Sequence, residues 1–296
     1  MSTGVNFSLG NAFTKDFGGG GPAAVMFLPT LTSYPDATML AIAKNFNQPM
    51  TAFVAKAPTP ASEADTAAFG IRWFTIAREL PLCGHATLVS AGAIFADPTL
   101  IAPSVTKLRF DAPSGSKLVA QKMDDGRIEI ALAATLLADL REEDAVRLRE
   151  ALAKTLGEDL KVVNMKWGQG TEGLRQYVLV EVDTPDLGAI RPMLTGLIGS
   201  PFVVHIIASA SRSPEFAFES RMFAALGDCV FEDPVCGSAH TLLGPYWKAK
   251  NNLPNTFRAN QVSSRGGDLK VTVDEASGQV QLAGHFKLVG KGEIFP

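Results

Sequence analysis

Two short segments of the chain carry the same spacing of residues that could do chemistry. The segments ELPLCGHA, residues 79–86, and EDPVCGSA, residues 232–239, share Glu, Pro, Cys, Gly and Ala at equivalent positions. Cys, of which the chain has only three, is among the five shared positions, so the match is more than chance spacing explains. The pattern indicates that the chain contains two related half-sites.

The cysteines of these segments, Cys83 and Cys236, are suited to proton transfer. Residues 86–96 and 239–247, which follow them, are apolar on almost every side, which predicts helices enclosed by other structure, although Pro245 should end or kink the second. A helix N-terminus carries unpaired N–H groups and partial positive charge, which favour a thiolate and bind carboxylates. Two such thiols on opposite faces of a carbon acid suit racemisation or epimerisation. The alternative is that both are small apolar residues in tight turns.

Composition excludes several other functions. The chain has 296 residues, 46% of them hydrophobic, and a net charge of -3 without a basic run, so we expect a globular protein that binds no nucleic acid. No apolar stretch approaches the ~18 residues of a membrane span and no signal peptide is visible, which predicts a cytoplasmic location without membrane contact. Three cysteines without CxxC spacing and four histidines without HExxH favour neither a disulfide nor a metal, and no P-loop or GxGxxG motif indicates a nucleotide cofactor.

Strand patterns dominate the chain, with few but well-marked helices, which predicts an α+β fold. Residues 36–46 and 141–157 have helical spacing of apolar positions, and residues 116–132 read as a hairpin that turns at 124–126. Two halves, each a curled sheet around one buried helix, would explain the repeated segments. We place the first domain at residues 1–112 and the second at 113–296, with the last strands able to return to the first.

The repeated segments and several others resemble the PhzF-like (phenazine biosynthesis-like) family of the diaminopimelate epimerase fold. The resemblance implies two pseudo-symmetric domains, each a β-roll around a central helix, with a cofactor-free active site in the cleft between them. Many such relatives pair as homodimers. The further segments that carry the likeness are GGPAAV (20–25), TAFV (51–54), RWFT (72–75), SRMF (220–223) and SSRGGDLKV (263–271).

The same resemblance implies roles for individual residues. His85, Asp233 and Ser238 match substrate-orienting positions, with Gly84 and Gly237 beside them at the helix starts, and Asp233 could also share acid/base duty. The family's catalytic Glu, in a stretch similar to SETAFV, is replaced by Met50, and the Asn of GNPAAV is replaced by Gly21. Epimerase and racemase relatives use one cysteine per domain, so Cys83 and Cys236 are the expected acid/base pair.

Other candidates have ordinary structural explanations. Glu79 could be a base, but its repeat partner Glu232 suggests that both hydrogen-bond the backbone of their turns. His240 is expected to pack inside the second helix, and Cys229 lies outside the repeat. Arg265 could clamp an acid or be solvated.

Two functions from different classes remain open. The first is a cofactor-independent isomerase that moves a proton on a small carboxylate-bearing metabolite, by epimerisation, racemisation or a double-bond shift. The second follows from the loss of the family carboxylate at Met50: a protein that binds a partner, or that orients a substrate for rearrangement. The substrate, whether a phenazine precursor, an amino acid or another product of secondary metabolism, is not specified by the sequence.

Overall fold

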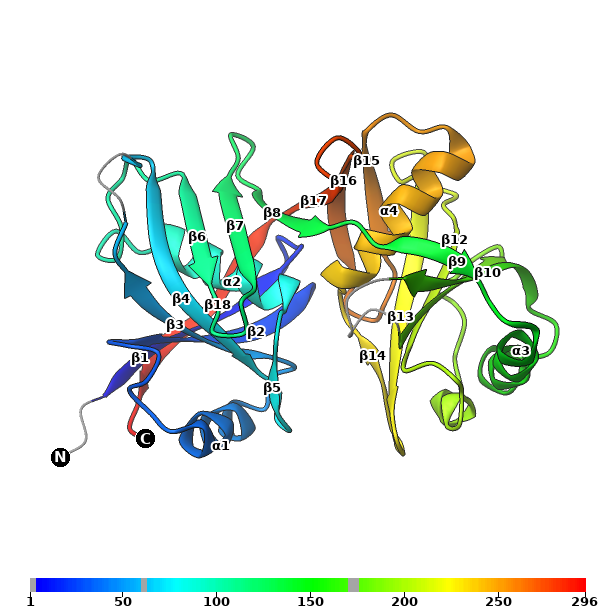
Figure 1. Cartoon of the computed structure of the whole chain (residues 1–296), viewed down its shortest axis with the longest axis horizontal. Coiled ribbons are helices and arrows are strands. Elements are labelled where there is room, and N and C mark those ends of the chain that lie inside the picture. Colours follow the sequence, from blue (N-terminus) through cyan, green and yellow to red (C-terminus); the bar gives the residue numbers. More distant parts are fainter. Residues whose placement is uncertain (1–3, 60–62, 170–175) are drawn as a thin grey trace. The chain divides into compact units, whose positions relative to one another are not determined.

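The chain divides into two compact units in a computed structural model that describes residues 4–59, 63–169 and 176–296. The first unit contains residues 1–132 and 281–296, and the second contains residues 133–280 (Figure 1). The division therefore lies at 132/133, beyond the predicted position at 112/113. The reason is that β7 (Lys117–Lys122) pairs with β6 (Lys107–Asp111) and β8 (Ile128–Ala133) pairs with β7, which keeps this hairpin in the first sheet.

The first unit is a sheet rolled around one helix. Its last strand, β8, pairs with β17 (Gln279–Gly284), and β17 leads through His285 into β18 (Phe286–Ile294), where the series of strands begins. Helix α1 (Asp36–Phe46) confirms the predicted helix and packs its buried face into a cluster with Met26 and Phe53. From β18 the neighbouring strands are β1 (Val5–Ala12), β2 (Gly21–Leu28), β3 (Thr51–Ala57), β4 (Thr66–Phe74), β6, β7 and β8, with the short β5 (Glu79–Leu80) at the end of β4.

Helix α2 (Gly84–Phe95) occupies the inside of this roll. Every residue from Gly84 to Ile94 is buried, and the helix contacts β1, β2, β3, β7 and β18. A helix that is apolar all round can be stable in water only when neighbouring structure covers all of its faces. Gly92 makes the closest of these contacts, because a Cβ there would lie 2.2 Å from the ring of Phe286. The predicted enclosed helix is therefore confirmed.

The second unit repeats this construction with its own strands. Helix α4 (Gly237–Asn251) contacts β9, β11 and β16, and α3 (Glu142–Leu156), predicted from its spacing, packs Leu148 and Leu152 into the unit's core. A 3-10 helix, η2 (Leu194–Leu197), lies against α3. The neighbouring strands are β9 (Leu136–Asp139), β10 (Lys161–Gln169), β11 (Tyr177–Asp183), β12 (Val204–Ala210), β13 (Phe218–Leu226), β15 (Thr256–Gln261) and β16 (Gly267–Asp274), with β14 (Cys229–Asp233) beside β13.

The strand pairings of the two units correspond one to one around each cysteine. β4 pairs antiparallel with β3 and β5 and parallel with β6, and β13 pairs antiparallel with β12 and β14 and parallel with β15. The register also matches, because Phe74 lies opposite Glu79 and Phe223 lies opposite Glu232. The repeated sequence segments therefore belong to a repeated strand, turn and helix.

Helix α4 continues through Pro245, so the expectation that this residue could end the helix is wrong. A proline inside a helix has no N–H to give to the carbonyl four residues earlier, here that of Thr241. The backbone N–H of Thr135 donates to this carbonyl instead, at 3.1 Å, and the hydroxyls of Thr135 and Thr241 lie 3.0 Å apart. The chain entering β9 thus replaces the hydrogen bond that the proline removes.

Gly92→Ala should destabilise the protein more than Gly244→Ala, a substitution at a buried glycine inside α4. A methyl group at Gly92 overlaps the Phe286 ring, an overpacking that costs about 1–3 kcal/mol. At Gly244 the nearest atom to an added Cβ is Val271 Cγ1 at 3.1 Å, and the gain in helix propensity of about 1 kcal/mol offsets most of the strain. Denaturant unfolding of the two variants measures the difference, and equal losses would contradict this packing.

Candidate functional site

Cys83 and Cys236 occupy equivalent positions, the N-cap residues of α2 and α4. Both are buried, with 8% and 4% of their surface exposed. In each helix the residue four positions later holds the cysteine carbonyl: the Thr87 hydroxyl donates to Cys83 O at 2.7 Å, and His240 Nδ1 donates to Cys236 O at 2.8 Å. The prediction that both thiols lie at helix starts is thus confirmed, with one of these cysteines in each unit.

The side chain two residues after each cysteine contacts its thiol. Cys83 Sγ lies 3.5 Å from His85 Nδ1, and Cys236 Sγ lies 3.2 Å from Ser238 Oγ. Ser238 Oγ in turn lies 2.9 Å from the hydroxyl of Tyr177, at the beginning of β11. Two residues predicted to orient a substrate are therefore also the neighbours of the two sulfur atoms.

A paired arginine and glutamate lie just before each cysteine. Arg72 Nε and Nη2 donate to Glu79 at 2.8 and 2.6 Å, and Arg221 Nε and Nη2 donate to Glu232 at 2.7 and 2.9 Å. Such bidentate pairs fix geometry as well as charge. Each guanidinium also lies over the ring two residues later in its strand, Phe74 at 5.0 Å and Phe223 at 5.1 Å.

These pairs correct the prediction for the two glutamates. Their carboxylates bind arginines of the adjacent strand, β4 or β13, and were expected to bind the backbone of their own turns. The reason is the antiparallel register, which sets β5 and β14 directly beside the strands that carry Arg72 and Arg221. The pairs anchor the segments that lead into Cys83 and Cys236.

The turn before Cys236 is held by side chains from two other places. Gln261, fully buried in β15, accepts from Cys236 N at 2.8 Å and donates to Asp233 O at 2.6 Å. Asp233 Oδ1 accepts from Val235 N at 2.9 Å, and Ser263 Oγ donates to Pro234 O at 2.7 Å. Asp233, predicted as a catalytic or substrate-binding group, is therefore also part of the turn that places the thiol.

The remaining predicted site residues lie in the first unit or at the helix starts. Met50 is buried immediately before β3, and its carbonyl accepts from Ala24 N at 3.0 Å. Gly21 is the buried first residue of β2. Gly84 and Gly237 are the first residues of α2 and α4 and are buried. Substrate contacts for these four residues stay a prediction.

His240, expected to pack, is fully buried against Phe218, with ring centroids 5.9 Å apart. Burial lowers the pKa of His240 to about 4, against the smaller opposing effect of its hydrogen bond to Cys236 O. Burial likewise lowers the pKa of His205 to about 4. Both imidazoles are therefore neutral at pH 7, and His240 holds the Cys236 carbonyl without adding charge beside the thiol.

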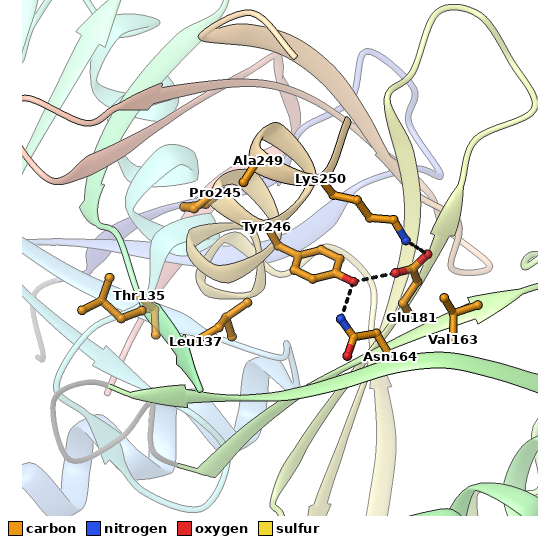
Figure 2. A pocket seen from close by; sticks show the side chains of 10 residues that line it. Thr135, Leu137, Val163, Asn164, Glu181, Pro245, Tyr246, Ala249 and Lys250 are labelled. Atoms are coloured by element: carbon orange, nitrogen blue, oxygen red, sulfur yellow. Dashed lines mark hydrogen bonds and ion pairs between the residues drawn. The ribbon is translucent and has the colours of Figure 1, made fainter. Parts of the chain in front are cut away.

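A surface groove of about 610 Å³ lies along α4 on the second unit. Figure 2 shows its polar wall, where Tyr246 donates to Glu181 at 2.5 Å, accepts from Asn164 at 3.0 Å, and Lys250 pairs with the same glutamate. Burial and the Glu181 contact raise the pKa of Tyr246 to about 12. None of the residues predicted to form the site lines this groove, and its polar groups tie α4 to β10 and β11.

Among the residues with a described placement, no group of three or more His, Cys, Asp and Glu side chains could hold a metal ion. Among the same residues no helix is long and apolar enough to cross a membrane.

The paired sheets and enclosed helices define a mixed α+β fold shared with epimerase-like proteins. A PhzF-family structure from Enterococcus faecalis matches 99% of this chain and 100% of its own, with a TM-score of 0.80 and 28% identity. A predicted epimerase from Pseudomonas aeruginosa has the same fold, with a TM-score of 0.69, 21% identity and 99% of each chain covered. An uncharacterized isomerase of Halalkalibacterium halodurans is 34% identical over 96% of both chains.

The family model for phenazine biosynthesis-like proteins matches residues 11–292. The chain belongs to this family, and the predicted resemblance is confirmed.

Sequence reasoning missed the residues that hold the two cysteines in place. Arg72 and Arg221 share the pattern Arg-x-Phe, but they precede their glutamates by 7 and 11 residues, and this difference in hairpin length hides the repeat. Gln261 and Tyr177 come from strands far along the chain and left no local signal. The Arg-x-Phe pattern was the one clue available.

Glu232→Gln should destabilise the protein more than Glu79→Gln. Arg221 and Glu232 expose 7% and 18% of their side chains, and removing one charge from such a buried pair costs about 3 kcal/mol. The Glu79 side chain is 37% exposed, and Arg72 keeps Asp36 as a second partner at 2.9 Å. Removing the charge of Glu79 should therefore lower the free energy of unfolding by about 1 kcal/mol. Denaturant unfolding at pH 7 compares the variants; a larger loss for Glu79→Gln would refute this ranking.

Acid should destabilise the second unit through its buried histidines. Because the folded-state pKa of His240 lies below its usual 6.5, its contribution to stability is complete above pH 6.5 and is lost as the pH falls toward 4. For a pKa shift of this size, the free energy of unfolding falls by about 3 kcal/mol. His240→Asn keeps a donor for Cys236 O but cannot titrate, so its unfolding free energy should fall less between pH 7 and 4 than that of the wild type. Parallel pH profiles would contradict the prediction.

Proposed function

We propose that the protein is a cofactor-independent isomerase that moves a proton on a small carboxylate-bearing metabolite, with Cys83 and Cys236 as its acid/base pair. The observation that carries this proposal is the duplication of a buried N-cap thiol together with its supporting structure. Both cysteines begin an enclosed helix, and both follow an arginine–glutamate pair in the same strand register. The relative from H. halodurans, named an isomerase, supports the reaction class.

The proposed reaction needs only these two sulfur atoms to exchange protons. One thiolate takes the proton from the carbon next to the substrate carboxylate, leaving the electron pair delocalised into that carboxylate. The other thiol gives its proton to the opposite face of the same carbon, or to a carbon further along a conjugated system. The first outcome is epimerisation or racemisation, and the second is a double-bond shift. Each turnover exchanges the protonation states of the two cysteines.

The helix starts supply the complement to the substrate's charge. N–H groups in the first turn of a helix lack intrahelical partners and attract a carboxylate. We assign this role to the helix starts at Gly84 and Gly237, with the side chains of His85 and Ser238 placed to orient the same ligand. Asp233 precedes the second helix and suits a substrate amine, or a share in proton transfer.

Met50 removes one possible acid/base group from this proposal. A buried methionine stands where the family resemblance implies a glutamate, so no carboxylate is available at that position. Proton transfer then falls to the thiols. Met50 and Gly21 would contribute an apolar, uncharged surface toward the substrate.

The same methionine favours a second candidate function. If Met50 marks the loss of proton transfer, the protein binds a partner or orients a substrate that rearranges by itself. The buried thiols would then be small packing residues at two helix starts. The two functions differ in whether either cysteine is needed for exchange of a substrate proton.

Replacement of Cys83 or Cys236 by Ser should abolish substrate proton exchange. We would incubate wild type and both variants in deuterium oxide with a panel of amino acids and dihydroaromatic acids, and measure deuterium uptake by mass spectrometry. Because general acid/base groups contribute roughly 10²–10⁴-fold, each variant should lose at least about 100-fold in rate. Cys229→Ser is the matched control, since Cys229 is exposed and lies outside the repeat.

The outcomes separate the two candidate functions. Uptake by wild type and Cys229→Ser alone supports the two-thiol reaction. Full uptake in both Cys83→Ser and Cys236→Ser overturns it. If wild type exchanges no compound on the panel, while tight binding of one of them survives both cysteine substitutions, the binding function is favoured.

A further inference from the structure

Three side chains form a continuous chain of contacts that ends at the sulfur of Cys236. The hydroxyl of Tyr177 lies 2.9 Å from Ser238 Oγ, and Ser238 Oγ lies 3.2 Å from Cys236 Sγ. Ser238 and Cys236 belong to the start of α4, whereas Tyr177 belongs to β11. The tyrosine therefore contacts the serine beside the thiol from a separate element of the second unit.

Hydroxyl groups suit a sulfur atom that must alternate between two protonation states. Each hydroxyl has one proton to donate and lone pairs to accept. With a protonated thiol, the hydrogen bonds can run from Cys236 to Ser238 and from Ser238 to Tyr177. With a thiolate, all of them can reverse, so that Tyr177 donates to Ser238 and Ser238 donates to the sulfur. Neither state leaves the buried sulfur without a hydrogen-bonding neighbour.

The first unit uses a different neighbour for its thiol. The residue two positions after Cys83 is His85, whose Nδ1 lies 3.5 Å from the sulfur. A neutral imidazole has a donor on one ring nitrogen and an acceptor on the other. A serine hydroxyl has a single proton that can turn in several directions, so its direction has to be set by a second group. Tyr177 is placed to do this for Ser238.

We propose that Tyr177 is a positioning residue for Cys236: by donating to Ser238 it directs the serine proton to the sulfur and stabilises the thiolate. This inference rests on the proposed acid/base role of Cys236. Tyr177 contacts Ser238 and acts on the sulfur through it. A hydrogen bond to a charged group is stronger than one to a neutral group, so the tyrosine favours the thiolate over the thiol.

The other groups around Cys236 do not substitute for this chain. Asp233 precedes it in the turn, Gln261 from β15 holds its backbone N–H, and His240 holds its carbonyl. His240 is neutral at pH 7, because burial lowers its pKa to about 4. The Arg221 and Glu232 charges on β13 and β14 are paired with each other. None of these hydrogen bonds and ion pairs includes Tyr177.

The test measures the protonation of Cys236 directly. In a Cys83→Ser, Cys229→Ser background Cys236 is the sole thiol of the chain, and its infrared S–H stretching band reports the protonated fraction without a reagent that must reach the sulfur. Tyr177→Phe should lower the ratio of thiolate to thiol at a fixed pH by about tenfold, the effect of losing about 1.4 kcal/mol of charge-assisted hydrogen bonding. Ser238→Ala should lower it at least as much.

Tyr246→Phe is the matched control. This tyrosine also belongs to the second unit, but its hydroxyl contacts Glu181 and Asn164 and is not part of the chain to Cys236. It should leave the S–H band unchanged at every pH. An equal band change in Tyr177→Phe and Tyr246→Phe would show a general loss of packing and overturn the inference.

Deuterium uptake in the otherwise wild-type chain separates this inference from the proposed function. If Tyr177→Phe leaves the S–H band unchanged while Cys236→Ser still abolishes uptake, the positioning role is wrong and the two-thiol reaction stands. If Tyr177→Phe shifts the band while Cys236→Ser retains full uptake, the hydroxyl chain is real but Cys236 is not an acid/base group. If the positioning role and the two-thiol reaction are both correct, deuterium uptake by Tyr177→Phe should be lowered at neutral pH and should recover as the pH is raised.

Discussion

The burial of two apolar helices is the constraint on which the rest of the structure depends. Helix α2 and the first turns of α4 expose almost no surface, so each needs a sheet around it and an entry for the chain at its N-terminus. At the N-terminus of a helix, the first backbone N–H groups have no hydrogen-bond partners within the helix. Placing a cysteine there combines a buried thiol with the partial positive charge of a helix N-terminus.

The supporting interactions repeat in kind but differ in strength. Both units use an arginine–glutamate pair over an aromatic ring, yet the Arg221 pair is buried and also reaches the carbonyls of Leu187 and Ile190, whereas Arg72 shares two exposed carboxylates. The turn into α4 is further held by Gln261. The second half-site is therefore the more constrained of the two, which suits a thiol whose protonation depends on distant side chains.

The groove beside Tyr246 shows why cavity size alone does not locate chemistry in this protein. Its polar groups satisfy one another, and they connect the exposed half of α4 to β10 and β11. Pro245 lies on the same stretch of helix, with Thr135 replacing its missing hydrogen bond. Together these contacts hold the second half of α4 to Thr135, β10 and β11, while Cys236 lies at the other end of the helix.

The sequence by itself determined the α+β class, the two helix starts and the pair of thiols, because these depend on local patterns: apolar periodicity, turn residues and one repeated eight-residue segment. The family followed from the resemblance of several short segments to a known family. Tertiary structure decided the partners. Glu79 and Glu232 bind arginines, the first unit includes β7 and β8, and Tyr177 contacts Ser238. Strand register and sheet closure bring these residues together, and their separation along the chain gives no local signal. Only the folded sheet brings such side chains within hydrogen-bonding distance.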